Sequence, residues 1–259
     1  MKQTKWLLVV LSMVVFSSGM VFAEDEIGFE LTTNFASKYI WRGQLLNDDI
    51  VFQPGLSATY GNFTAGIWGN LDLTNYNGRN GDFLEMDYYL DWSDDLSDLE
   101  GVGYSVGLIY YDFPGSYANG TRLPDTLEAY LGLNFDLPAN PSISAYHDID
   151  EVDGTYVSLG IGHSVEQVLE LSSDIPVAMD IGATLGWGSA SYDKYYWGTN
   201  QSKINDLVLS VSFPFEIEGL TITPSLNYVT LLSDDIRDTD VYGTASDFFF
   251  FGIGLTKKF

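Results

Sequence analysis

Ionisable side chains recur on the polar side of several alternating stretches of this sequence. Because successive side chains of a β-strand point to opposite faces, residues two apart, such as Glu85 and Asp87, share a face. Acids and bases that face each other around an enclosed space set a transverse electric field, and an excess of acids favours cations. The candidate pore-lining residues are Lys38, Arg42, Asp72, Glu85, Asp87, Asp91, Glu128 and Asp180. The alternative is that these groups pair with each other in a plugged, structural barrel.

An acidic loop, DIDEVDG, runs from Asp148 to Gly154. Clustered carboxylates on a bent loop suit a hard cation such as calcium. The spacing differs from the EF-hand pattern by one residue, and the distant glutamate of that pattern is missing. We therefore favour a solvated acidic loop, assign no metal ligand, expect no cofactor, and leave calcium as an open hypothesis.

The two histidines, His147 and His163, need to be weighed as catalytic residues. Each follows apolar residues in register, so both are expected on the apolar face near strand ends, and neither has a serine two residues away on that face. The sequence also contains no cysteine, which excludes a thiol nucleophile. We expect no enzyme, and a lipid hydrolase on the outer wall is the least favoured alternative.

The elements that must position the charged residues are strands. The last stretch, DFFFFGIGLTKKF from Asp247 to Phe259, places large apolar residues at nearly every second position. The same alternation predicts twelve strands, the first from about Ile27 to Arg42. Turns are predicted at 61 to 62 and at 166 to 175, and the longest loop from Ala190 to Lys203. An even count places both termini on one side of a barrel, and we expect this side to be periplasmic.

Residues 1 to 23 have the features of a secretory signal peptide. Lys2 and Lys5 precede an apolar run, and small residues precede Glu24, the expected start of the mature chain. Residues 24 to 259 show no linker and are expected to form one domain. The formal net charge of −25 argues against a nucleic-acid partner.

The composition of the polar face favours a membrane barrel over a soluble sandwich or a lipocalin-like barrel. That face is mostly Gly, Ser, Thr, Asn and Tyr with acids and is nearly free of lysine, whereas soluble sheets protect their edges with charged residues. A closed sheet also leaves no unpaired backbone in lipid. We therefore predict an all-β fold, a transmembrane antiparallel up-and-down β-barrel of about twelve strands with the apolar faces toward lipid.

Several segments of the first half carry a family resemblance. They are NFASKYIWRG (Asn34 to Gly43), QPGL (Gln53 to Leu56), FTAGIWGN (Phe63 to Asn70), Glu85-Met-Asp87, GYSVGLIYYDFPG (Gly103 to Gly115) and LEAYL (Leu127 to Leu131). Over roughly Phe29 to His163 the chain resembles the Gcw_chp family of outer-membrane barrels. The resemblance implies location and fold, and it provides no catalytic motif to transfer. The aromatic end at Phe259 resembles the closing strand of bacterial outer-membrane barrels, which the barrel-assembly machinery reads.

These observations lead to one expected function with an alternative. We expect a porin-like passive diffusion channel of the outer membrane of a Gram-negative bacterium, with weak cation preference for small solutes. Outer-membrane lipid, lipopolysaccharide and the assembly machinery, through Phe259, are the expected partners. The alternative is a non-conducting barrel whose acidic, aromatic outer loops bind a partner or a cation. The sequence leaves open the solute, whether the lumen is open or plugged, and whether the barrel is single or oligomeric.

Overall fold

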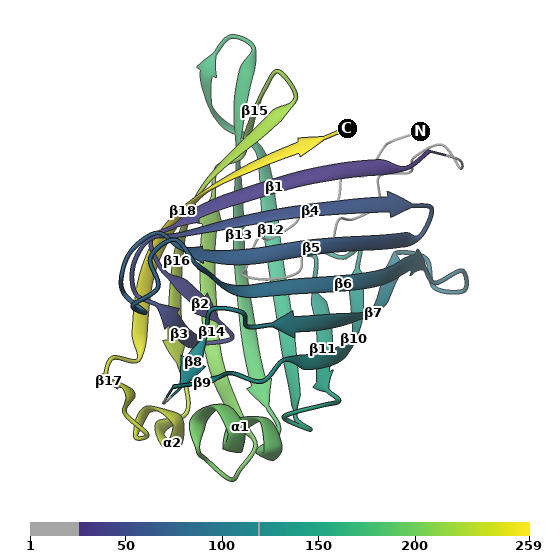
Figure 1. Ribbon diagram of the computed structural model, residues 1–259. Coiled ribbons are helices and arrows are strands. Elements are labelled where there is room, and N and C mark those ends of the chain that lie inside the picture. Colours follow the sequence, from purple (N-terminus) through teal and green to yellow (C-terminus); the bar gives the residue numbers. More distant parts are fainter. Residues whose placement is uncertain (1–25, 119) are drawn as a thin grey trace.

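The computed structural model describes residues 26 to 118 and 120 to 259, and it shows a closed antiparallel β-barrel (Figure 1). The predicted signal peptide, residues 1 to 23, lies outside the described residues. Among the described residues, twelve strands form the wall. They are β1 (Gly28–Ala36), β4 (Val51–Tyr60), β5 (Phe63–Asp72), β6 (Phe83–Asp95), β7 (Val102–Asp112), β10 (Thr126–Phe135), β11 (Ser142–Asp148), β12 (Thr155–Ser172), β13 (Ile175–Gly188), β14 (Lys203–Ser212), β16 (Leu220–Leu231) and β18 (Asp247–Lys258).

The wall closes because every one of these strands has two neighbours. Each strand pairs with the wall strand before and after it in the chain, and β1 pairs with β18. The backbones of Phe29 and Phe259 exchange two hydrogen bonds, with N···O distances of 3.3 and 2.9 Å. The barrel therefore has no open edge at its seam, as a sheet in lipid requires.

The alternation of side chains has the predicted orientation, with apolar residues outward. Leu131, Ile161 and Phe251 are 49%, 54% and 58% exposed, although they lie in the interior of long strands. The acidic residues of the opposite faces are buried inside the barrel. An exposed apolar band around a buried polar lining is the arrangement of a transmembrane β-barrel, and the fold predicted from the sequence is confirmed.

Both ends of the wall lie at one end of the barrel, which we call the terminal end (Figure 1). Here two hairpins extend beyond the other strands: β12 with β13, and the short β15 (Phe215–Ile217) with β16. The predicted turn at 166 to 175 is therefore wrong, because β12 continues to Ser172 and only 173 to 174 form the turn. Bulges after Val165 and Glu170 bend this part of the strand, which weakens the alternation in the sequence.

The opposite end, which we call the loop end, carries the longer connections. They contain α1 (Ala190–Trp197), α2 (Asp234–Arg237), β17 (Val241–Thr244) and the hairpin of β8 (Tyr117–Ala118) with β9 (Thr121–Arg122). The loop predicted from Ala190 to Lys203 thus contains a two-turn helix, capped at its start by the side chain of Ser189. None of the helices in the described ranges has the length and apolar character needed to cross a membrane.

The predicted first strand, Ile27 to Arg42, is too long. β1 ends at Ala36, and the chain then forms a hairpin of β2 (Tyr39–Trp41) and β3 (Gln44–Asn47). Its two-residue turn has left-handed backbone at Arg42 (φ 49°) and Gly43 (φ 80°), which suits a tight hairpin. Tyr39 and Trp41 continue the apolar set of β1, so that set alone did not mark the end of the wall strand. The apolar Ile40 between them breaks the alternation, because this segment is buried on both faces.

The outward face generates a prediction about depth in the membrane. Leu131 lies in the middle of β10 and Leu137 lies just beyond its end, and both are exposed. We expect Leu131→Arg to reduce the free energy of folding into lipid vesicles by roughly 2–4 kcal/mol, and Leu137→Arg by roughly 0–1 kcal/mol. Equilibrium unfolding in urea with vesicles present measures both. Equal effects of the two substitutions would contradict the lipid-facing assignment of Leu131.

Candidate functional site

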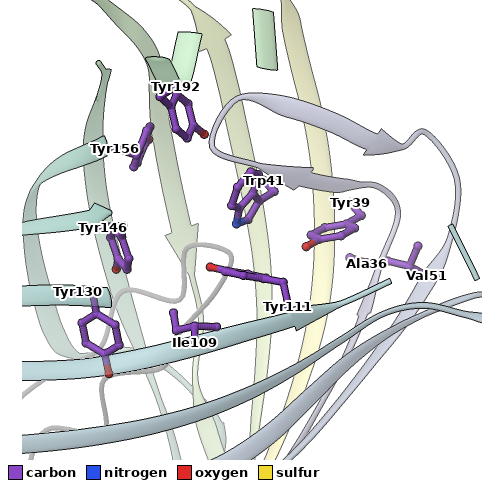
Figure 2. Packing of buried hydrophobic residues seen from close by; sticks show 10 residues of the cluster. All are labelled: Ala36, Tyr39, Trp41, Val51, Ile109, Tyr111, Tyr130, Tyr146, Tyr156 and Tyr192. Carbon is purple, nitrogen blue, oxygen red and sulfur yellow. The ribbon is translucent and has the colours of Figure 1, made fainter. Parts of the chain in front are cut away.

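Residues 37 to 50, which contain the β2–β3 hairpin, fold into the lumen. We call this segment the inward hairpin (Figure 2). An ion pair between Lys38 and Asp48 joins its two legs. Asn47 Nδ2 donates a hydrogen bond of 2.7 Å to Asp72 Oδ1 on the wall strand β5. The first loop of the barrel is thus anchored inside the barrel and not above it.

The inward hairpin contacts opposite walls. Tyr39 and Trp41 belong to a buried cluster with wall residues of β7, β10, β11 and β12 (Figure 2). Ile40, on the other side of the hairpin, packs with Val208 of β14 and Phe248 of β18. Since both of its faces are covered, the hairpin bridges the lumen from wall to wall in the half near the loop end.

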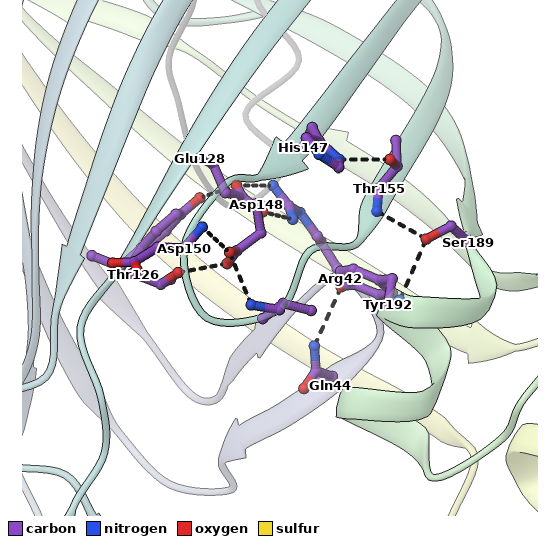
Figure 3. A network of polar contacts seen from close by, with 12 residues as sticks. Arg42, Gln44, Thr126, Glu128, His147, Asp148, Asp150, Thr155, Ser189 and Tyr192 are labelled. Carbon is purple, nitrogen blue, oxygen red and sulfur yellow. Dashed lines mark hydrogen bonds and ion pairs between the residues drawn. The ribbon is translucent and has the colours of Figure 1, made fainter.

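Arg42, at the tip of this hairpin, carries the most enclosed cation of the site (Figure 3). Its Nη1 and Nη2 atoms donate to the two carboxylate oxygens of Glu128 at 2.7 and 2.8 Å, a bidentate ion pair. Its guanidinium also lies over the rings of Tyr146 and Tyr156, with distances of 4.4 and 4.8 Å to the ring centroids. The ring of Trp41 lies 4.4 Å from the same group.

Wall contacts hold the groups around Arg42 in place. The hydroxyl of Tyr111 donates to Glu128 Oε2 at 2.8 Å. The hydroxyl of Tyr156 donates to Asp206 Oδ1 at 3.0 Å. We call Glu128, Tyr146 and Tyr156 with the supporting Tyr111 and Asp206 the guanidinium cage. All five members lie on wall strands.

Glycines on the lumen face make room for these tyrosines. A Cβ atom on Gly186 would lie 2.1 Å from the hydroxyl of Tyr156, and one on Gly107 would lie 2.5 Å from that of Tyr130. Tyr130, Tyr146 and Tyr156 are direct neighbours across β10, β11 and β12, so they form one row along the wall. The glycines of the polar face therefore provide the space that these tyrosine side chains occupy.

Six of the eight predicted site residues lie on wall strands with buried side chains: Asp72, Glu85, Asp87, Asp91, Glu128 and Asp180. Several have neutral partners. Glu85 accepts from the hydroxyl of Tyr39 at 2.9 Å, and Asp180 accepts from Ser164 at 2.8 Å. Oδ1 of Asp87 is buried without a hydrogen-bond partner among the described residues. The acidic side chains are thus spread along the lumen, and Glu128 is the one among these six that forms an ion pair with a predicted base, Arg42.

The prediction that Lys38 and Arg42 lie on a wall strand is wrong. Both belong to the inward hairpin, because the wall strand β1 ends before them. Sequence reasoning also missed Asp206, Tyr111, Tyr146 and Tyr156. The signal that could have found the tyrosines is a tyrosine at a polar-face position of each of four successive wall strands. An analysis of alternation treats such a tyrosine only as an uncharged residue of the polar face.

A cavity lies on the terminal side of the inward hairpin. Its lining runs from Glu30, Ser57 and Thr256, near the terminal end of the barrel, to Arg42 and Gly43 at the hairpin tip. The rest of the lining combines threonine, serine, asparagine and glycine with apolar residues such as Ile67 and Phe250. The lumen is thus hollow on the terminal side of the hairpin and is bridged by the hairpin on the loop side.

Helix α1 covers the half near the loop end. Its Tyr192 ring packs against Tyr156, with centroids 5.4 Å apart, and Tyr192 accepts a hydrogen bond from Gln44 at 3.4 Å. Asp193, a residue of α1 itself, is fully buried and accepts a hydrogen bond from Asn205 at 2.8 Å. Burial raises the pKa of Asp193 to about 6, against the opposing effect of the Asn205 hydrogen bond.

The acidic loop uses its first carboxylate to cap its own backbone. Asp148 Oδ1 accepts from the amides of Asp150 and Val152 at 3.0 Å each, and Oδ2 accepts from Thr126 at 2.6 Å (Figure 3). In the part of the chain that the structure describes, no three His, Cys, Asp or Glu side chains are grouped as a metal site. The loop is therefore a self-capped turn, and we do not carry the calcium hypothesis further.

Both histidines are exposed on the outer face, as expected from their register. His147 Nδ1 lies 2.9 Å from the hydroxyl of Thr155, its direct neighbour on β12, and Nε2 lies 3.7 Å from Asp153. The hydroxyl group beside His147 thus belongs to a threonine and not to the serine of a hydrolase pair.

A family model described as "Bacterial protein of unknown function (Gcw_chp)" matches residues 23–216. The chain belongs to this family. The Gcw_chp match extends beyond the segment that the motifs indicated and covers the inward hairpin, the guanidinium cage and α1. No curated protein matches the chain.

Several solved structures resemble the Gcw_chp barrel in fold. LpxR from Salmonella typhimurium is 11% identical, with 88% of this chain and 99% of that chain covered and a TM-score of 0.49. A NanC porin is 12% identical, covers 89% and 100%, and has a TM-score of 0.47. An outer membrane channel from Pseudomonas putida F1 is 10% identical, covers 90% and 94%, and has a TM-score of 0.42. At these values the likeness carries no functional argument.

The buried ion pair generates a prediction about stability. We expect Glu128→Gln to reduce the free energy of unfolding by roughly 3–5 kcal/mol, because it leaves the Arg42 guanidinium buried without a counter-charge. Urea unfolding in detergent, followed by tryptophan fluorescence, measures the change. Lys203→Gln is the control, since its ion pair with Asp235 is partly exposed to solvent and worth less than about 1 kcal/mol. A similar loss in both variants would contradict the special role of the Arg42 pair.

Proposed function

We propose that this protein is a porin-like passive diffusion channel of the bacterial outer membrane, with weak cation preference and with the inward hairpin as its constriction. The apolar outer band and closed wall support insertion in lipid. Both termini are then periplasmic and the loop end faces outward. The proposal includes no enzymatic activity.

One observation carries this proposal. A cavity leads from the terminal end to the tip of the inward hairpin, and beyond that point the hairpin and α1 narrow the lumen. The hairpin is tied to the wall by side-chain contacts and is not part of the main sheet. The backbones of Ser37 and Ile50 are still bonded to the wall, at Phe251 and Leu73. A displacement of residues 38 to 49 would therefore widen the passage without breaking the wall.

The proposed surroundings follow from the outer surface. The exposed apolar band would contact outer-membrane lipid, and the loop end would lie among lipopolysaccharide. The closing strand β18, which leads to the exposed Phe259, would be read by the barrel-assembly machinery.

Conductance in planar bilayers tests the channel. We expect small or infrequent steps for the unmodified protein, because the hairpin bridges the lumen in the half near the loop end. Replacing residues 39 to 47 by a short Gly-Ser linker should give larger and more frequent steps, since the linker leaves the wall strands unchanged. Absence of steps in both proteins would end the channel proposal.

The second candidate function is a non-conducting barrel whose outer loops bind a partner. The buried clusters of the loop end favour it, because Tyr192, Trp197 and Ile236 seal that half with almost no exposed surface. Steps that appear only after the hairpin is replaced would support this second function in place of a diffusion channel.

Charge selectivity tests the proposed role of the lumen acids. We expect Glu85→Gln with Asp87→Asn to shift the reversal potential in a salt gradient toward zero, because both carboxylates lie beside the hairpin on β6. Asp94→Asn with Asp95→Asn, at the exposed end of the same strand, is the control and should change the potential less. Anion preference of the unmodified protein would contradict the proposal.

A further inference from the structure

We propose that the guanidinium cage is a binding site for a guanidinium-bearing solute, and that Arg42 occupies it as an intramolecular substitute while the inward hairpin is in place. The inference rests on the proposed channel only for the route by which a solute would pass through the barrel. Binding itself does not require conduction.

The cage has the shape and charge of a guanidinium receptor. Glu128 offers two oxygens to two nitrogens at 2.7 and 2.8 Å, which matches the fixed fork of a guanidinium. The rings of Tyr146 and Tyr156, at 4.4 and 4.8 Å, cover the same planar cation. An ammonium is a point charge and cannot make the paired contacts, so the site should prefer guanidinium compounds to amines.

The cage does not depend on the hairpin for its construction. Glu128 is held by the hydroxyl of Tyr111, and Tyr156 is held by Asp206, all from wall strands. The space for Tyr156 is set by Gly186 in the neighbouring strand β13. The receptor groups should therefore keep their positions when Arg42 leaves, and a preformed site loses little entropy on binding.

The occupant of the cage borders the cavity. Arg42 and Gly43 belong to the cavity lining, at the end of a space that begins near the terminal end. Arg42 is also the tip residue of a two-residue turn, so withdrawal of the hairpin tip would take its side chain out of the cage and open the cage toward this cavity. An incoming guanidinium would take over the contacts that Arg42 gives up.

Chemical rescue of Arg42→Gly tests the inference. Glycine suits the left-handed backbone at this position, so the turn should persist while the cage loses its occupant. Millimolar ethylguanidinium should raise the thermal unfolding midpoint of R42G in detergent by roughly 2–4 °C, whereas ethylammonium should not. In the unmodified protein the same shift should need at least about tenfold more ligand, because Arg42 competes intramolecularly.

Glu128→Gln in the R42G background supplies the matched control and should abolish the rescue. Equal shifts with ethylammonium, a rescue that survives Glu128→Gln, or no shift in R42G would each overturn the inference. These readouts involve no current, so a failure of the conductance test does not affect them.

A second measurement uses the unmodified protein, in case R42G does not fold. Saturating ethylguanidinium should displace Arg42 and increase hydrogen exchange of the amides of residues 39 to 47, while the amides of β10 stay protected. Ethylammonium at the same concentration should leave the exchange unchanged. Unchanged exchange with ethylguanidinium would count against the site.

Discussion

The buried charge of Arg42 is the constraint on which the interior depends. An isolated guanidinium inside a protein is costly, and its removal from water is offset only by ideal geometry and additional partners. The bidentate contact with Glu128 and the rings of Tyr146 and Tyr156 supply both. The pair at the tip thus acts together with the Asn47 hydrogen bond and the packing of Ile40 in holding the hairpin in the lumen.

The lining of the wall is organised around this pair. Tyrosines lie along the strands over glycines and reach acids, as Tyr130 does over Gly107 toward Asp91 and Tyr156 over Gly186 toward Asp206. A tyrosine supplies apolar area together with a hydroxyl that can satisfy a buried carboxylate. Around Arg42 the half near the loop end is thus packed with polar-ended side chains, while smaller apolar clusters, such as Ile40 with Val208 and Phe248, lie on the other side of the hairpin.

The sequence predicted the features that follow from backbone geometry. Alternation in stretches such as β10 and β18 indicated the strand faces, the strand count and the outward apolar band, because these depend on period and composition alone. It did not separate β1 from the inward hairpin, since Tyr39 and Trp41 keep the apolar register of β1 and the only break in the alternation is the single apolar residue Ile40. The acids Glu85, Asp87 and Glu128 were found by type and register. The cage was not, because it joins residues from five strands that only the folded barrel brings together.

The position of the inward hairpin in the chain also limits the order of assembly. It follows the first wall strand, yet the partner of its charge, Glu128, comes 86 residues later on β10, and the covering ring of Tyr156 comes later still. A contact of such long sequence separation forms slowly and late. Until β10, β11 and β12 are side by side, Arg42 has no receptor and stays hydrated, so the interior of the barrel is completed only after most of its wall.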